Sequence, residues 1–215
     1  MTAPYYQDEA VTLYHGDCLE ILTWLDADVL VTDPPYGTAT WALSYGRRQN
    51  RKPGQVGAAP GAIANDDDTT HRDLALSLWG SRPALVFGSP RRPDPPMAVV
   101  DRLVWDKKRP GMNSGPWRYR HESIYVTGGF ERRSDASVSI LTAWPDQSDH
   151  IHAKPLGLMV SLIDCAPDGT IADPFAGSGS TLVAARNLGR KAIGVEIEER
   201  YCEVIARRLA QGVLL

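Results

Sequence analysis

Four consecutive residues, Asp33-Pro34-Pro35-Tyr36, combine groups that could activate an exocyclic amino group of a nucleobase. Such a nitrogen is a poor nucleophile because its lone pair is delocalised into the ring. The Asp33 carboxylate and the Pro34 carbonyl could both accept its hydrogens and so localise that lone pair. The two prolines fix the turn, and Tyr36 offers an aromatic face for an extruded base. We therefore predict Asp33, Pro34, Pro35 and Tyr36 as catalytic, although the motif alone could also be a rigid turn.

A second turn, Asp173-Pro174-Phe175-Ala176-Gly177-Ser178-Gly179-Ser180, joins an expected strand to an expected helix. Its glycines allow the backbone to approach a ligand closely, and the helix N-terminus offers unpaired N–H groups. Glu196 ends the next expected strand, 19 residues after Gly177, where a carboxylate can accept hydrogen bonds from two ribose hydroxyls. The turn is not GxGxxG and no Walker lysine follows, so nucleoside triphosphate binding is not expected. Together the turn and the acid predict a ribose-containing cofactor.

Short apolar runs that end in turn residues alternate with helical patterns, which predicts an α/β fold with a mostly parallel sheet and helices on both faces. The expected strands are residues 11–15, 29–32, 84–87, 103–105, 123–127, 170–172 and 191–195, with an extended excursion at 137–144. The expected helices are residues 18–25, 70–79 (capped by Thr70), 96–101, 155–165, 178–188 and 199–210. Ligands bind at the carboxyl ends of strands in such sheets. Asp17, Asp33, Asp173 and Glu196 follow or end expected strands, so they should share one rim.

The chain length of 215 residues fits one domain, residues 1–215. The three cysteines form no CxxC pair, which argues against disulfides and zinc and favours a reduced, cytoplasmic protein. His150 and His152 have no partner cluster, so no metal site is expected. No apolar run of 18 residues exists and the first residues do not resemble a secretory signal, so neither a membrane span nor secretion is expected.

Basic residues gather in two segments although the net charge is −3. Residues 38–65, which lack periodicity and are expected to form a long loop, carry four basic residues and no acidic one. Residues 102–133 carry eight basic and three acidic residues. A phosphate backbone responds to local patches rather than to the whole-chain charge. The residues predicted to bind nucleic acid are Arg47, Arg48, Arg51, Lys52, Lys107, Lys108, Arg109 and Arg118. Solvated surface charge is the alternative.

The two turns together resemble the amino-group DNA methyltransferases that make N6-methyladenine or N4-methylcytosine. The Asp-Pro-Pro-Tyr motif comes first and the cofactor turn last, as in the permuted class known as β, and the resemblance covers nearly the whole chain. Further similar segments are His15-Gly16-Asp17-Cys18, Val104-Trp105-Asp106-Lys107, His150-Ile151-His152-Ala153-Lys154-Pro155 and Val195-Glu196-Ile197. Ile151 stands where the family usually has proline.

The resemblance implies a circularly permuted, Rossmann-like S-adenosylmethionine-dependent methyltransferase fold with a seven-stranded, mostly parallel sheet and one antiparallel strand. It implies S-adenosyl-L-methionine as the methyl donor and direct transfer to a base flipped out of double-stranded DNA. The residues that match the cofactor segments are Asp17, Cys18, Asp33, Lys154, Pro155, Asp173, Pro174, Phe175, Ala176, Gly177, Ser178, Gly179, Ser180, Glu196 and Ile197. Between the expected strand at residues 123–127 and the Lys154-Pro155 segment, only residues 128–149 are available as a target-recognition segment. A short DNA site is therefore expected, with the 38–65 loop or a second subunit of a homodimer as possible contributors.

Several activities remain to be separated. Asp-Pro-Pro-Tyr is commoner among the adenine enzymes of this family and Ser-Pro-Pro-Tyr among those acting on cytosine N4, so the resemblance favours adenine N6 and keeps cytosine N4 as the alternative. Cytosine C5 methylation uses a thiolate that typically follows proline, and no cysteine here does. RNA and protein-glutamine methyltransferases more often show Asn-Pro-Pro-Tyr in an unpermuted order. Intact motifs argue against an inactive nucleic-acid-binding module, and a restriction-modification partner is left open.

Overall fold

The computed structural model describes residues 2–37, 64–108, 117–131, 138–144 and 153–211. The strands are β1 (Tyr6–Gln7), β2 (Val11–His15), β3 (Val29–Thr32), β4 (Ala84–Gly88), β5 (Asp101–Asp106), β6 (His121–Val126), β7 (Ile140–Thr142), β8 (Ile171–Asp173) and β9 (Ala192–Glu196). The helices are the 3₁₀ turn η1 (Thr23–Asp26) and α2 (Thr70–Trp79), α3 (Leu156–Asp164), α4 (Ser180–Asn187) and α5 (Glu199–Ala210). None of these helices is long and apolar enough to cross a membrane.

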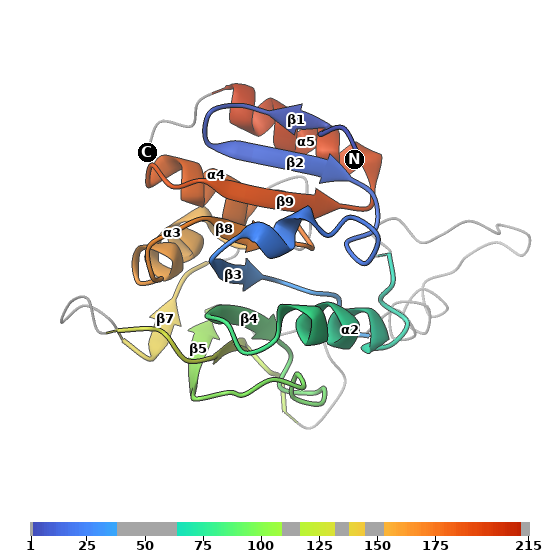
Figure 1. The fold of residues 1–215 in the computed structure, drawn as a ribbon. Helices are drawn as coiled ribbons and strands as arrows, with labels where there is room; N and C mark the ends of the chain where they lie inside the picture. The colour runs from blue at the N-terminus through green and yellow to red at the C-terminus, as the bar shows by residue number, and fades with distance from the viewer. Residues whose placement is uncertain (1, 38–63, 109–116, 132–137, 145–152, 212–215) are drawn as a thin grey trace, which may run out of the picture.

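The strands form one sheet in the order β1-β2-β9-β8-β3-β4-β6-β5-β7 (Figure 1). β2, β9, β8, β3 and β4 run parallel to one another, and β6 runs antiparallel to both β4 and β5. The seven strands from β2 to β5 therefore match the expected mostly parallel sheet with one antiparallel strand. The sheet has two strands more than expected, because the short strands β1 and β7 extend its edges.

Helical layers cover both faces of the sheet (Figure 1). Val29 and Val31 of β3 point to the face packed by α3, α4 and α5. Leu30, between them, points to the opposite face, where η1 and α2 pack. Successive side chains of a strand alternate between the faces, so the apolar run Val29–Val31 and the burial of all four residues of β3 suit a strand covered on both sides. The expected two-sided α/β architecture is confirmed.

The expected helix at residues 18–25 is wrong, since only the single turn η1 forms there. The spacing of leucines predicts a buried helical stripe, but Leu22 is 44% exposed and the buried side chains are Cys18, Ile21 and Trp24. After Asp17 the chain makes one turn, in which the Asp17 side chain accepts the Leu19 N–H at 2.8 Å and its carbonyl accepts the Ile21 N–H at 2.8 Å. The bonds that follow, from Leu25 N–H to the Leu22 carbonyl and from Ala27 N–H to the Trp24 carbonyl, join residues three apart, as in a 3₁₀ turn rather than an α-helix.

Two other local expectations also need correction. Residues 96–100 form no helix; Val100 N–H instead donates to the Val126 carbonyl at 2.8 Å, and β5 begins at Asp101. The Val100 N–H, which a helix would have used internally, thus takes part in sheet pairing. Helix α2 begins at Thr70, but Thr70 is not its cap, because the N-cap position is Thr69 and the Asp68 side chain accepts the Thr70 N–H at 2.8 Å. The remaining expected elements form with small shifts at their ends.

Candidate active site

The structure places the four predicted rim acids at one edge of the sheet. β2, β9, β8 and β3 are neighbours and parallel, so Asp17, Glu196, Asp173 and Asp33 lie where these strands end. All four side chains line one cavity of about 440 Å³. That volume is in the range of small-molecule sites. The parallel pairing, rather than proximity in sequence, brings these acids together.

The cavity contains nearly all of the residues that the motifs singled out. Its wall includes the four residues of the Asp33–Tyr36 turn, together with every predicted cofactor residue except Pro155 and Gly179. Pro155 occupies the N-cap position of α3, and Gly179 that of α4, where it packs towards Ile205 of α5. These two residues therefore do not line the cavity and instead lie at the N-termini of the helices beside it.

The glycine-rich turn is hydrogen-bonded to Glu196. Gly177 N–H donates to Glu196 Oε2 at 2.7 Å, and Glu198 N–H donates to Oε1 at 2.8 Å. Burial raises the pKa of the Glu196 carboxyl to about 7, although these two hydrogen bonds oppose the shift. A carboxylate has about four lone-pair positions, so acceptor capacity remains for two further donors. The site thus offers an acid at the position where a ribose is expected.

Gly179 supplies a testable structural constraint on this turn. Its φ is +79°, and an added Cβ would lie 2.7 Å from Ile205 Cγ1. We expect Gly179→Ala to lower the free energy of unfolding by about 1–3 kcal/mol, since strain and overpacking add. Urea unfolding followed by circular dichroism measures the change. Gly157→Ala is the matched control, because a Cβ there meets nothing within 4 Å and the site lies in α3. Equal stability of the two variants would contradict the expectation.

Asp173 begins the same turn and is buried. Its Oδ1 accepts a hydrogen bond from Thr32 Oγ1 at 2.7 Å and one from Phe175 N–H at 3.2 Å. Burial raises the pKa of this carboxyl to about 6, against the effect of its hydrogen bonds. Asp173 therefore links the glycine-rich turn to the end of β3, one residue before Asp33.

At the Asp-Pro-Pro-Tyr turn, both oxygens of Asp33 have partners. Tyr36 OH donates to Asp33 Oδ1 at 2.5 Å, and Lys154 Nζ donates to Oδ2. A second acid, Glu122, lies beyond: Lys154 Nζ is 3.4 Å from Glu122 Oε2, and Lys107 Nζ donates to Glu122 Oε1. Acids and ammonium groups thus alternate in a row from Asp33 through Lys154 and Glu122 to Lys107, and the Tyr36 hydroxyl lies within hydrogen-bonding distance of both acids.

The charges in this cluster support one another. Burial alone would lower the pKa of Lys154, but the neighbouring charges of Asp33 and Glu122 raise it above its ordinary value. Burial likewise opposes the ionisation of Glu122, yet Lys154 and Lys107 hold the pKa of its carboxyl below the ordinary value. Burial, and then the charge of Asp33, raise the pKa of Tyr36. At neutral pH, Glu122 is therefore a carboxylate, Lys154 an ammonium ion and Tyr36 a neutral phenol.

Sequence reasoning did not identify Glu122. The pattern of apolar runs singles out acids at the carboxyl ends of strands, whereas Glu122 is the second residue of β6. Because β6 is antiparallel to β4 and β5, its first residues lie at the same edge as the ends of its neighbours. The available signal was a single acid ahead of the buried segment Ser123 to Val126, which a parallel assignment of that strand would place at the opposite edge.

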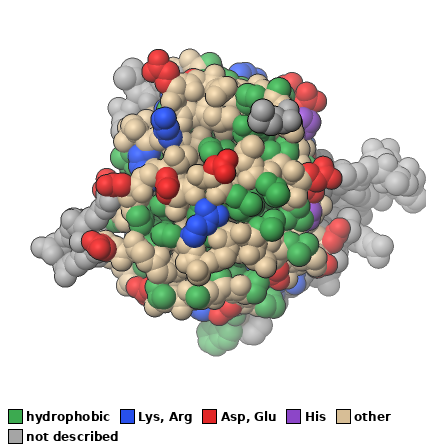
Figure 2. All heavy atoms as spheres, viewed as in Figure 1, with side chains coloured by type: hydrophobic (Ala, Val, Ile, Leu, Met, Phe, Trp, Pro, Cys, Tyr) green, Lys and Arg blue, Asp and Glu red, His purple; other side chains and the backbone are tan. Residues whose placement is uncertain are grey.

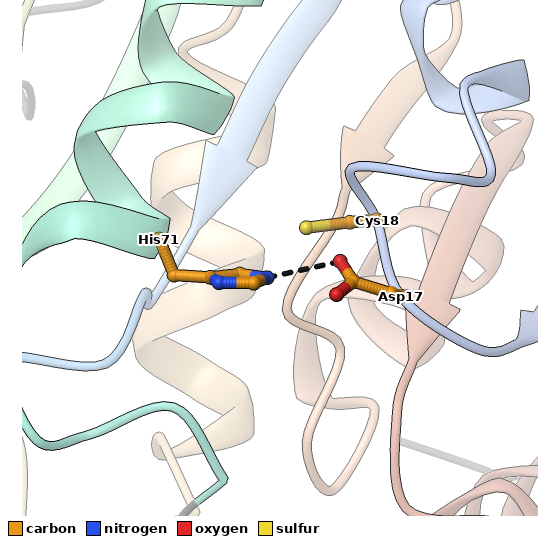
Figure 3. A group of neighbouring side chains, drawn as sticks. All are labelled: Asp17, Cys18 and His71. Atoms are coloured by element: carbon orange, nitrogen blue, oxygen red, sulfur yellow. Dashed lines mark hydrogen bonds and ion pairs between the residues drawn. The ribbon is translucent and has the colours of Figure 1, made fainter.

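His71 was also not predicted, and it closes a group with Asp17 and Cys18 (Figure 3). Figure 3 shows the imidazole, at the start of α2, directed towards Asp17, and Nε2 lies 2.9 Å from Asp17 Oδ1. One potential ligand atom from each side chain lies within 4.8 Å of the others. Burial raises the pKa of the Cys18 thiol to about 12, so this group is a neutral thiol at pH 7. We assign the group to the wall of the cavity.

The predicted nucleic-acid-binding residues have different outcomes. Lys107 lines the cavity, whereas Lys108 and Arg118 are exposed and do not line it. Arg47, Arg48, Arg51, Lys52 and Arg109 lie outside the described residues, as do His150 to His152 and much of the 38–65 and 128–149 segments. On the face shown in Figure 2, the Lys and Arg side chains are scattered among Asp and Glu. The assignment of a DNA surface stays a prediction.

Comparisons with known proteins point to one family. The model of the N6/N4 methylase family, described as DNA methylase, matches residues 130–207. The chain is 36% identical to the putative methylase YubD of Escherichia coli (strain K12) over 216 residues, which cover 91% of this chain and 88% of YubD. It is 27% identical to the type II methyltransferase M.ScaI of Streptomyces caespitosus, over 96% of this chain and 83% of M.ScaI.

Solved structures share the fold. A crystal structure of an M1.HpyAVI–SAM complex superposes with a TM-score of 0.63 and 22% identity, covering 92% of this chain and 99% of that chain. The cytosine-N4-specific PvuII DNA methyltransferase superposes with a TM-score of 0.64 and 15% identity, covering 96% of this chain and 89% of that chain. The expected methyltransferase fold is therefore confirmed.

Proposed function

This chain belongs to the N6/N4 family of DNA methylases, and we propose that it transfers a methyl group from S-adenosyl-L-methionine to the N6 amino group of adenine in a short double-stranded DNA site. One observation carries the proposal: a single cavity joins the Asp33–Tyr36 turn to the glycine-rich turn and Glu196. An amino-group acceptor site and a ribose acceptor site therefore lie within reach of one bound cofactor.

The glycine-rich half of the cavity fits a nucleoside. Glu196 has its backbone bonds to Gly177 and Glu198 and retains acceptor capacity for two ribose hydroxyls. Asp17 and Cys18 line the same part of the wall, where the family resemblance expects the adenosine. When bound, the sulfonium cofactor supplies an electrophilic methyl group. The protein's part is to hold the cofactor's nucleoside so that this group faces the Asp33 turn.

The Asp33 half of the cavity fits an extruded base. The Asp33 carboxylate and the Pro34 carbonyl would accept the two amino hydrogens, which favours a tetrahedral nitrogen with a localised lone pair. Tyr36 OH donates to Asp33 Oδ1 at 2.5 Å, so the phenol orients the carboxylate and its ring offers a stacking face. Because the chemistry takes place inside a cavity, the target base must leave the helical stack and enter by base flipping.

Cytosine N4 remains the second candidate. It presents the same kind of exocyclic amino group, so the Asp33 and Pro34 acceptors would serve it equally. The similarity of the fold to the cytosine-N4-specific PvuII enzyme favours keeping it. Adenine is preferred because the motif is Asp-Pro-Pro-Tyr rather than Ser-Pro-Pro-Tyr. A homodimer, suggested by the short 128–149 segment, is part of the proposal for how a DNA site is read.

Nucleoside analysis tests the proposal directly. The purified protein is incubated with mixed-sequence double-stranded DNA and methyl-labelled S-adenosyl-L-methionine, and the DNA is digested and analysed by mass spectrometry. We expect labelled N6-methyladenine. Labelled N4-methylcytosine would replace the first candidate with the second, and no labelled nucleoside would contradict both. A reaction without protein is the control for non-enzymatic transfer.

A further inference from the structure

The Asp33 carboxylate has no free oxygen in the structure. Tyr36 OH occupies Oδ1 and the Lys154 ammonium occupies Oδ2. The proposed reaction needs Asp33 to accept a hydrogen from the target amino group. Each oxygen keeps a second lone pair, but the ammonium against Oδ2 already balances the charge that the incoming amino group would use. Asp33 therefore accepts the amino hydrogen better when one of its two partners moves away.

Lys154 is the partner that can move. Its ammonium lies 3.4 Å from Glu122 Oε2, so a second carboxylate is already near. The Tyr36 hydroxyl has a single hydrogen, which it directs to Asp33 at 2.5 Å, while its distance to Glu122 Oε2 is 3.2 Å. An ammonium group has three donors and can pass between acceptors without losing all of its bonds. Without Glu122, the buried Lys154 ammonium would have no carboxylate partner after it moved away from Asp33, which is strongly unfavourable.

Glu122 is held in a position to receive it. Lys107, which follows β5, donates to Oε1 of Glu122 and leaves Oε2 directed to Lys154. Glu122 is also opposite Trp105 in the β5–β6 pairing, so its backbone is held by the neighbouring strand β5. The groups that face this carboxylate are Lys107, Lys154 and Tyr36, with Asp33 beyond them. The two cations keep the pKa of Glu122 low, so it remains an anionic acceptor.

We propose that Glu122 is a positioning residue of the methyl-transfer site: it receives the Lys154 ammonium when the target amino group takes Asp33 Oδ2. This inference rests on the proposed function and assigns a role to a residue that the motifs do not include. No covalent step is involved, since Glu122 acts on Asp33 only through Lys154. The alternative is an ion pair that merely stabilises the start of β6, and the two interpretations predict different kinetics.

Glu122→Gln removes the charge and keeps the shape. We expect the single-turnover rate constant for methyl transfer to fall about tenfold to a hundredfold, the scale of losing one electrostatic contribution at an active site. The dissociation constant for S-adenosyl-L-methionine should change by less than about twofold, because Lys154 keeps its bond to Asp33 and the Glu196 end is untouched. Glu122→Asp should recover part of the rate. Glu9→Gln, at an exposed acid, is the control and should match the unmodified protein.

A double variant distinguishes positioning from simple stabilisation. If Glu122 acts through Lys154, its loss has no further effect once Lys154→Met is present, so the double variant and Lys154→Met alone should have equal rate constants. Multiplying losses in the double variant would overturn the inference, as would a full rate in folded Glu122→Gln. Failure of Glu122→Asp to recover any rate would also count against it. If the unmodified protein produced no methylated nucleoside, the proposed function itself would fail instead.

Discussion

Asp33→Ala is expected to abolish methyl transfer, with a loss on the order of 10³-fold in the single-turnover rate constant. The carboxylate is the side-chain acceptor proposed for the target amino group, and alanine leaves only the Pro34 carbonyl. The variant should still fold, because Lys154 keeps Glu122 as a partner at 3.4 Å. Cofactor affinity should fall by less than about tenfold, since the contacts expected at Glu196 and the glycine-rich turn remain.

Two measurements check this result together. Rapid-quench single-turnover assays with labelled cofactor report the rate, and calorimetric titration with S-adenosyl-L-methionine reports the affinity. Asp101→Ala is a suitable control, because Asp101 is exposed on β5 and does not line the cavity. Retained methyl transfer in Asp33→Ala would remove Asp33 from the proposed mechanism. Loss of both activity and cofactor binding would place Asp33 in the cofactor site rather than in the chemistry.

Glu196→Gln is expected to weaken S-adenosyl-L-methionine binding by about tenfold to a hundredfold, the equivalent of one or two hydrogen bonds to a charged acceptor. The same carboxyl gives the unmodified protein a pH dependence. Its pKa is raised to about 7 by burial, so it is ionised at pH 8 and largely protonated at pH 6. Ribose hydroxyls donate better to the ionised form. Affinity should therefore decrease as the pH falls through 7, by about tenfold between pH 8 and pH 6.

Calorimetric titrations at pH 6, 7 and 8 follow this dependence. Glu196→Gln should show a nearly constant, weak affinity across the series because its amide does not titrate in this range. Glu199→Gln, three residues away on an exposed position of α5, should retain the pH dependence of the unmodified protein. A dissociation constant independent of pH in the unmodified protein would mean that Glu196 does not contact the bound cofactor through its ionised form.

The two turns that we propose to carry the chemistry could be located from the sequence alone. Asp33, Asp173 and Glu196 each coincide with the end of an apolar run, and parallel strands bring such ends to one edge whatever their order. The sequence also determined the element type wherever the pattern was long, as in α5, whose bounds match the expected residues 199–210. It was wrong at residues 18–25, where the backbone bonds from Leu22 onward join residues three apart and form the short 3₁₀ turn η1 instead of an α-helix.

Which distant side chains meet at that edge depends on the tertiary structure. Glu122 reaches Lys154 because β6 runs antiparallel between β4 and β5, and strand direction is not encoded in the apolar pattern of β6. His71 reaches Asp17 because α2 packs beside η1 on one face of the sheet. Local sequence encodes turns and elements through backbone preferences and short-range hydrogen bonds. Pairs such as Glu122 with Lys154 depend on strand order, strand direction and layer packing, which arise only when the whole sheet assembles.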